Sequence, residues 1–115
     1  MKQDTCIFCK IIAKEIPAAV QYEDDKVLAF NDIAPVAPIH ILIVPKVHVN
    51  SLVSVTGADI DLLGHIQWVA AQIAANVPEL ANGYRVITNC GDWAGQSVFH
   101  LHYHLIGGKQ LTWNF

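Results

Sequence analysis

Three histidines stand at every second position near the end of the chain, in the stretch FHLHYHL that contains His100, His102 and His104. Alternate side chains of a β-strand share one face and lie about 6.6–6.8 Å apart, so a strand over 97–106 would place the three imidazoles on one face. Imidazoles this close cannot all be protonated near neutral pH, because like charges lower one another's pKa. At least one ring therefore stays neutral, and its free nitrogen can bind a metal, abstract a proton or attack phosphorus.

The residues between these histidines are apolar or aromatic, and we expect them to face the core. They are Leu101, Tyr103 and Leu105. A tris-histidine metal site is an alternative use of the other face, as in zinc hydrolases. Rings two residues apart on one strand do not converge easily on one ion, so this alternative is less favoured, as is a polar face without a special task.

Two cysteines near the start of the chain, Cys6 and Cys9, form a C-x-x-C motif. A thioredoxin-like role requires a strand directly before such a motif, and the sequence predicts none there. As half of a zinc site, the motif needs two further ligands from elsewhere in the chain. Three cysteines in all do not indicate a disulfide framework, so a reducing cytoplasm is the expected location.

The composition predicts one globular domain over residues 1–115, because 53% of the residues are hydrophobic and only 15% are charged. A net charge of −3 argues against an extended nucleic-acid surface, which needs a basic excess. The apolar runs are shorter than the roughly 20 residues that a bilayer requires. The first ten residues also lack the long apolar stretch of a signal peptide, so we expect neither nucleic acid nor membrane as a partner.

The elements that would position these residues alternate short strands with two helices. A short helix is expected over 4–14, capped by Asp4 or Thr5, and a long one over 57–76, whose apolar residues recur every three or four positions. Strands are expected over 20–23, 27–31, 39–44, 84–89 and 97–106. Loops fall at 32–38, where two prolines exclude a central strand, and at 90–95. Short turns between the first strands favour an antiparallel sheet in an α+β domain.

The stretch from Gly95 to Ile106, GQSVFHLHYHLI, resembles the signature of the histidine-triad (HIT) family, in which three histidines alternate with apolar residues after Gly-Gln-Ser-Val. The similarity extends over nearly the whole chain. It includes CIFCKII at 6–12, FNDI at 30–33, APIH at 37–40, VPKVH at 44–48, GYRV at 83–86 and GGKQL at 107–111. Together these motifs are similar to the Hint branch, the nucleoside phosphoramidases. A histidine at position 104 separates the chain from the nucleotidyltransferase branch, which has glutamine there.

The resemblance implies a catalytic role for several residues of this stretch. His102 would be the nucleophile that attacks the α-phosphorus of a purine nucleoside phosphoramidate and forms a nucleotidyl-histidine. Its other ring nitrogen would donate to a main-chain carbonyl of the same strand. Ser97 and His104 would contact the phosphate and the leaving group, with Asn89 at the same site, and His40 would lie behind the triad.

Nucleotide-binding residues follow in the same way. Asp32 would bind the ribose hydroxyls, for which a turn-capping aspartate is the structural alternative. An apolar slot for the base would be formed by Phe8, Ile11, Phe30 and Ile33, each of which could instead be a core residue. Glycine-rich turns can receive anionic oxygens at their amides, and here such a turn contains Gly95, Gln96 and Val98.

The resemblance also implies a structural zinc on Cys6, Cys9, His48 and His100, and no catalytic metal. HIT proteins usually form a two-fold homodimer in which the sheet continues across the interface. Two alternatives stay open: a dinucleoside polyphosphate hydrolase of the same superfamily, and a regulatory protein that binds nucleotide or zinc. The resemblance assigns no role to His65, Cys90 or Trp93.

Overall fold

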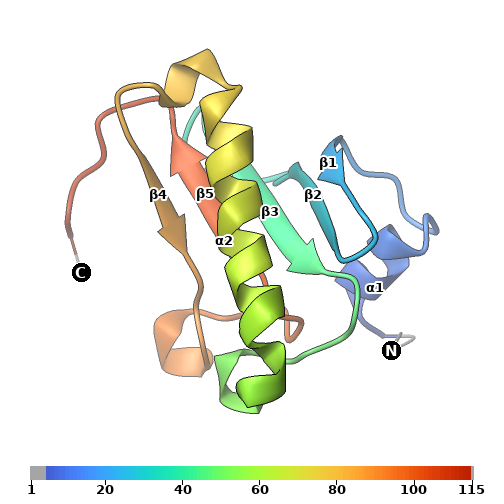
Figure 1. Ribbon diagram of the computed structural model, residues 1–115. Helices are drawn as coiled ribbons and strands as arrows, with labels where there is room; N and C mark the ends of the chain where they lie inside the picture. The colour runs from blue at the N-terminus through green and yellow to red at the C-terminus, as the bar shows by residue number, and fades with distance from the viewer. Residues whose placement is uncertain (1–4, 115) are drawn as a thin grey trace.

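The computed structural model describes residues 5–114 and contains one five-stranded sheet with a helix on each side (Figure 1). The strands are β1 (Val20–Glu23), β2 (Val27–Asn31), β3 (Ile39–Pro45), β4 (Tyr84–Ile87) and β5 (Tyr103–Gly107). The helices are α1 (Ile7–Ile12) and α2 (Ile60–Ala75). Single 3-10 turns lie at Leu52–Ser54, Gly57–Asp59, Pro78–Leu80 and Asp92–Ala94.

The sheet has the strand order β1-β2-β3-β5-β4, and every neighbouring pair is antiparallel. This confirms the predicted α+β class and the antiparallel sheet. Of the predicted strands, 20–23 and 27–31 match the structure, 39–44 is one residue short, and 84–89 is two residues too long. No helix within residues 5–114 is both long and apolar enough to cross a membrane.

The two faces of the sheet hold two separate cores. Helix α2 covers one face (Figure 1), where its buried residues pack against strand residues of β2, β3 and β5. On the other face, α1 packs against Leu28, Phe30, Leu42 and Val44. This division follows from the two-residue period of a strand, and it places Leu101, Tyr103 and Leu105 in the α2 core, as the sequence predicts.

The predicted histidine strand is the main point where the structure differs from the sequence-based expectation. Strand β5 begins only at Tyr103, so His100 and His102 precede it instead of belonging to it. The reason lies in the main-chain partners: the Leu101 amide donates to the Val49 carbonyl at 2.6 Å, and the His102 carbonyl accepts from the Thr88 hydroxyl at 2.8 Å. These bonds replace the ladder of a regular strand over 97–102.

The N-terminal helix is also shorter than predicted. Helix α1 begins at Ile7, and its N-cap is Cys6, whose sulfur accepts from the Cys9 amide at 3.3 Å. Thr5 is not the cap, and Asp4 lies outside the described residues. Helix α2 begins at Ile60, after a capping box between Thr56 and Asp59, instead of at position 57.

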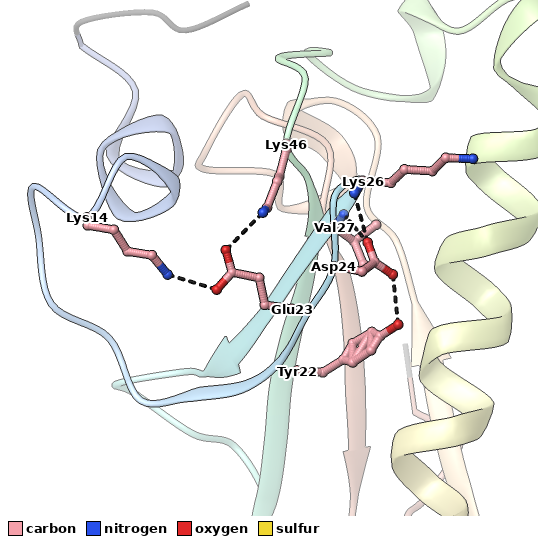
Figure 2. Close-up of polar contacts among 7 residues, drawn as sticks. All are labelled: Lys14, Tyr22, Glu23, Asp24, Lys26, Val27 and Lys46. Atoms are coloured by element: carbon pink, nitrogen blue, oxygen red, sulfur yellow. Dashed lines mark hydrogen bonds and ion pairs between the residues drawn. The ribbon is translucent and has the colours of Figure 1, made fainter.

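The β1–β2 turn is fixed by the side chain of Asp24 (Figure 2). Asp24 Oδ1 accepts from the amides of Lys26 and Val27, both at 2.8 Å, and its Oδ2 accepts from the Tyr22 hydroxyl at 2.7 Å. His65 Nε2 of α2 reaches the same Oδ2 at 2.7 Å, so this carboxylate joins the helix to the sheet.

Burial raises the pKa of Asp24, but the hydrogen bonds from Tyr22, the Lys26 amide and His65 outweigh it and hold that pKa well below its usual range. The neighbouring Glu23 bridges Lys14 at 2.9 Å and Lys46 at 2.8 Å (Figure 2). The first of these bonds joins β1 to the loop after α1, and the second joins it to the loop after β3.

Candidate active site and metal centre

The triad histidines lie on the α1 face of the sheet, but they do not form one ligand group. Among residues 5–114, the side chains close enough to share an ion fall into two sets. One set contains Cys6, Cys9, His48 and His100, and the other contains Asp32, His40 and His104. His102 belongs to neither set, so the geometry does not support a tris-histidine metal site.

One ring nitrogen of His102 makes a hydrogen bond to the main chain, and the other makes none within residues 5–114. Its Nδ1 lies 2.7 Å from the His100 carbonyl oxygen, which can only accept, so Nδ1 carries the proton and donates. Nε2 of the neutral ring therefore keeps its lone pair. Phe8 of α1 packs edge-on against this ring with centroids 5.1 Å apart, and the side chain is 7% exposed. This is the arrangement a nucleophilic imidazole requires.

A chain of hydrogen bonds fixes the tautomers of His40 and His104. The Val36 amide donates to His40 Nδ1 at 3.1 Å, so the proton of that neutral ring lies on Nε2. His40 Nε2 lies 2.8 Å from His104 Nδ1 and donates to it. The proton of a neutral His104 must then sit on its own Nε2, and this atom is buried without a hydrogen-bond partner in residues 5–114.

Burial keeps both of these histidines neutral. It lowers the pKa of His104 to about 4, with further contributions from the nearby His102 and His40. It also lowers the pKa of His40, although Asp32 acts in the opposite direction. The Asp32 Oδ2 lies 3.4 Å from His40 Nε2. A buried N–H without a hydrogen-bond partner lowers the stability of the fold by about 1–3 kcal/mol. His104 Nε2–H is therefore available to donate to an acceptor on a ligand.

The side chain of Gln96 is buried under the loop at 90–95 and holds it by hydrogen bonds. Its Oε1 accepts from the Gly91 amide at 2.8 Å, and its Nε2 donates to the carbonyls of Asn50 at 2.8 Å and Val98 at 3.1 Å. Gly91 and Gly95 flank the 3-10 turn with φ of 90° and 88°, a conformation that favours glycine.

Of the four successive amides at positions 95–98, two already have partners. The amides of Gly95 and Gln96 donate to the carbonyls of Asp92 and Gly91. Within the described part of the chain, the amides of Ser97 and Val98 have none. The amides of Ser97 and Val98 are therefore the ones free to receive an anion, and the Gln96 side chain bonds to the main chain around the loop.

The residues predicted for nucleotide binding divide between core and surface. Phe8, Ile11 and Phe30 are buried in the α1 core, with the rings of Phe8 and Phe30 in edge contact at 5.6 Å. Ile33 is almost completely exposed. Ser97 is also exposed, Asn89 and Val98 are half-buried, and Asp32 lines a cavity of about 270 Å³ with His40.

Three segments meet at a group of four side chains that we call the cysteine–histidine cluster: Cys6, Cys9, His48 and His100. The cysteines belong to α1 and its N-cap, His48 follows β3, and His100 precedes β5. Their ligand atoms lie within 4.8 Å of one another. Cys9 Sγ is 3.3 Å from His48 Nδ1 and 3.5 Å from His100 Nδ1, and Cys6 Sγ is 3.4 Å from His100 Nδ1.

The tautomers of the cluster fit a metal ion. His48 Nε2 donates to Asn50 Oδ1 at 2.9 Å, and His100 Nε2 donates to the Pro45 carbonyl at 2.8 Å. Both Nδ1 lone pairs therefore face the sulfurs, His100 Nδ1 toward Cys6 and Cys9 and His48 Nδ1 toward Cys9. Two thiolates and two imidazoles are a typical zinc ligand set, and here the Asn50 side chain and the Pro45 carbonyl fix the orientation of the two rings.

Burial sets the ionisation of the cluster without an ion. It lowers the pKa of His100 to about 4, partly offset by the bond to Pro45 and reinforced by the neighbouring His48 and His102. Burial also raises the pKa of the Cys6 thiol. A zinc ion would favour the thiolate form and release the thiol protons.

Some contributing groups could not be predicted from residue type. Thr88, Val36 and Pro45 act through a hydroxyl or through the main chain, and the partners of Thr88 and Pro45 lie 14 and 55 residues away in sequence. Asn50, two residues after His48, could have been inferred from the sequence, because a histidine that binds a metal usually donates its other ring N–H to a nearby polar group.

Comparison with known proteins gives a consistent result. A family model described as the HIT domain matches residues 13–111. The chain is 49% identical over 110 residues to the adenylylsulfatase HINT1 of Arabidopsis thaliana, covering 93% of this chain and 74% of that one. It is also 49% identical over 109 residues to a 14 kDa zinc-binding protein of Brassica juncea, covering 93% and 96% of the two chains.

Solved structures show the same likeness. A histidine triad protein from Clostridium difficile has a TM-score of 0.95 and 50% identity, with coverage of 100% of this chain and 99% of that chain. A HIT family hydrolase from Legionella pneumophila has a TM-score of 0.92 and 45% identity, with coverage of 95% and 97%.

Proposed function

The chain belongs to the HIT superfamily, in its Hint-like branch, and we propose that this hydrolase cleaves the P–N bond of purine nucleoside 5′-phosphoramidates through a covalent nucleotidyl-histidine. The observation that carries the proposal is the pair of fixed tautomers on one face of the sheet. His102 Nδ1 donates to the His100 carbonyl and leaves Nε2 as a nucleophile, while His104 Nε2–H is a buried donor without a partner in the described chain.

In the first step, His102 Nε2 attacks the α-phosphorus. A bond from phosphorus to Nε2 forms while the bond from phosphorus to the amine breaks, and the electron pair of that bond goes to the departing nitrogen. This nitrogen takes up a proton, for which we assign His104 as the donor: the hydrogen-bonded pair of His104 and His40 takes up one proton together with the anionic substrate, Nε2–H of His104 passes to the amine, and the pair is left neutral. In the second step, water attacks phosphorus and the bond to His102 breaks. One proton of the water returns to His104 and the other stays with the nucleoside monophosphate.

Other residues bind and orient the substrate in this scheme. The amides of Ser97 and Val98 receive the non-bridging phosphate oxygens, assisted by the Ser97 hydroxyl and Asn89. Asp32, whose carboxylate lines the 270 Å³ cavity, binds the ribose hydroxyls. The base lies against Ile33 and the outer edge of the α1 core, where Phe8, Ile11 and Phe30 support it.

The same site also supports a second substrate class, adenylyl sulfates, because one relative is named an adenylylsulfatase. The attack on phosphorus is the same there, and only the leaving group differs. A dinucleoside polyphosphate is a third candidate. A purely regulatory role would make the free Nε2 of His102 incidental.

The cysteine–histidine cluster is proposed to hold a structural zinc, a role supported by its donor set and by the name of the zinc-binding relative. We also infer a two-fold homodimer. Strands β1 and β4 are the edges of the sheet, and β4 leaves Tyr84 and Val86 exposed, which would suit a continuation of the sheet. A cytoplasmic location is part of the same proposal.

The test is to incubate the purified protein with adenosine 5′-phosphoramidate and to measure AMP, in parallel with His102→Ala. We expect release by the parent protein and a loss of several orders of magnitude in the variant. His65→Gln serves as the matched control, because His65 lies on the opposite side of the sheet and pairs with Asp24. Absence of AMP from the parent, or undiminished AMP from His102→Ala, would refute the proposal. Activity on a dinucleoside polyphosphate alone would reassign the substrate.

A further inference from the structure

His100 takes part in both sites through different atoms. Its ring Nδ1 faces Cys6 Sγ at 3.4 Å and Cys9 Sγ at 3.5 Å, within the cysteine–histidine cluster. Its carbonyl oxygen accepts from His102 Nδ1 at 2.7 Å. The side chain is completely buried. The ring of His100 thus belongs to the cluster, and its main-chain carbonyl orients the His102 ring.

The main chain at His100 is not held by the sheet. Strand β5 starts three residues later, and the neighbouring main-chain bond runs from the Leu101 amide to the Val49 carbonyl at 2.6 Å. The ring adds a bond from Nε2 to the Pro45 carbonyl at 2.8 Å. Pro45 ends β3, and Val49 lies in the following loop, which also contains His48. The position of the His100 carbonyl therefore depends on how this segment and the cluster are arranged.

Without an ion, only weak contacts hold the rings of the cluster to its sulfurs. Cys9 Sγ lies 3.3 Å from His48 Nδ1, and Cys6 Sγ lies 3.4 Å from His100 Nδ1. The two thiol hydrogens can satisfy both lone pairs, but a thiol is a weak donor. A zinc ion would replace these contacts with bonds to both rings and so restrain the His100 ring more firmly.

We propose that the cysteine–histidine cluster is a positioning device for the nucleophile: with zinc bound, His100 is fixed by its ring, and its carbonyl then holds His102 in the Nδ1–H tautomer with Nε2 free. This inference rests on the proposed function for its catalytic consequence. His48 is a positioning residue in the same sense, since it is a member of the cluster, packs against the His100 ring and makes no contact with His102.

The competing explanation is a cluster that only holds the fold together. In that case its loss would weaken the whole domain and would affect all histidines equally. The two explanations differ in a property of the His102 ring itself. The ¹⁵N shifts of imidazole distinguish the Nδ1–H from the Nε2–H tautomer, and they can be measured whether or not the protein turns over a phosphoramidate.

The experiment uses the full chain with ¹⁵N-labelled histidine at pH 7.5, loaded with zinc and then dialysed against a chelator. It is repeated on His48→Ala and on His48→Cys, which restores a four-ligand set, with His65→Gln as control. We expect His102 to show a single Nδ1–H tautomer in the loaded parent and a mixture of both tautomers after zinc removal or in His48→Ala. His104 should stay in the Nε2–H form throughout, and His48→Cys with zinc should regain the parent spectrum.

Kinetics provide a second readout. In His48→Ala, kcat should fall on the order of ten- to a hundredfold, the size of effect seen when a group that orients a reacting residue through its neighbours is lost, with KM changed by less than about twofold. A His102 tautomer that stays single after zinc removal and in His48→Ala overturns the inference. Loss of all dispersed core signals in both samples overturns it as well, because the cluster would then act on the whole fold. A parent protein without phosphoramidase activity would refute the proposed function but leave the spectral result decisive.

Discussion

Replacing His104 with glutamine should separate two kinds of leaving group. The side chain of glutamine keeps an N–H that can donate a hydrogen bond but cannot transfer a proton. An amine leaves phosphorus only if its nitrogen becomes protonated, whereas sulfate is the anion of a strong acid and leaves without a proton. His104→Gln should therefore impair the cleavage of adenosine 5′-phosphoramidate much more than the cleavage of adenylyl sulfate.

The magnitude follows from the fixed tautomers. The bonds from the Val36 amide to His40 and from His40 to His104 place the mobile proton of His104 on Nε2, where it has no partner in residues 5–114. General acid catalysis by such a group contributes about 10²–10⁴-fold, equivalent to about 2.7–5.5 kcal/mol. We expect kcat/KM for the phosphoramidate to fall by this factor and that for adenylyl sulfate to fall by less than about tenfold.

The assay measures AMP from both substrates with the same enzyme preparations, so that the ratio of the two losses is independent of the active fraction. His65→Gln controls for the loss of a histidine elsewhere, and thermal melting of each variant verifies the fold. Equal losses on the two substrates would show that His104 only binds the shared phosphate. An unchanged phosphoramidate rate would show that another group supplies the proton.

Three further predictions concern stability and metal content. Asp24→Ala removes an acceptor of four hydrogen bonds and should lower the free energy of unfolding by about 2 kcal/mol and Tm by ~8 °C in thermal melting. The matched change Asp25→Ala, at an exposed position, should leave Tm nearly unchanged. Equal effects of the two changes would contradict the role of Asp24 in the turn. Cys9→Ser should abolish the near-stoichiometric zinc expected by elemental analysis of protein prepared without chelator, and Cys90→Ser should retain it; zinc-free parent protein would contradict the site. Because the pKa of His104 is about 4 when folded, against an ordinary value of 6.5, the unfolded chain binds more protons between these values. Denaturant unfolding should therefore show stability falling from pH 6.5 to 4, by at most about 3 kcal/mol from this residue, and a smaller fall in His104→Gln. The same pH dependence in parent and variant would contradict that origin.

The positions of the first strands and the antiparallel character of the sheet were predictable because they depend on local patterns, whereas the strand order was not predicted. Alternation of apolar and polar residues predicted which face each of Leu101, Tyr103 and Leu105 would occupy, and the structure confirms it. The extent of the last strand was not predictable. The bonds from Leu101 to Val49 and from Thr88 to His102 join residues distant in sequence, and nothing in the residue types at 97–102 signals them.

The candidate site shows the same limit. The three histidines and the C-x-x-C motif can be recognised by type and spacing, and the structure brings Cys6, Cys9, His48 and His100 together as the family resemblance implied. What the sequence does not contain is the ring tautomers, since these are set by carbonyls and amides that every residue possesses. Their consequence, a free Nε2 on His102 and a free N–H on His104, needed three-dimensional contacts to emerge.

The most direct test of the central claim, that His102 Nε2 attacks phosphorus, is the detection of the covalent intermediate. The protein is mixed with adenosine 5′-phosphoramidate at a single-turnover ratio, quenched in alkali within milliseconds to seconds, and analysed by mass spectrometry intact and after digestion. We predict an adenylyl adduct that forms before AMP appears, decays as AMP accumulates, and maps to His102. AMP formation without any adduct, or an adduct on another residue that persists in His102→Ala, would contradict the account.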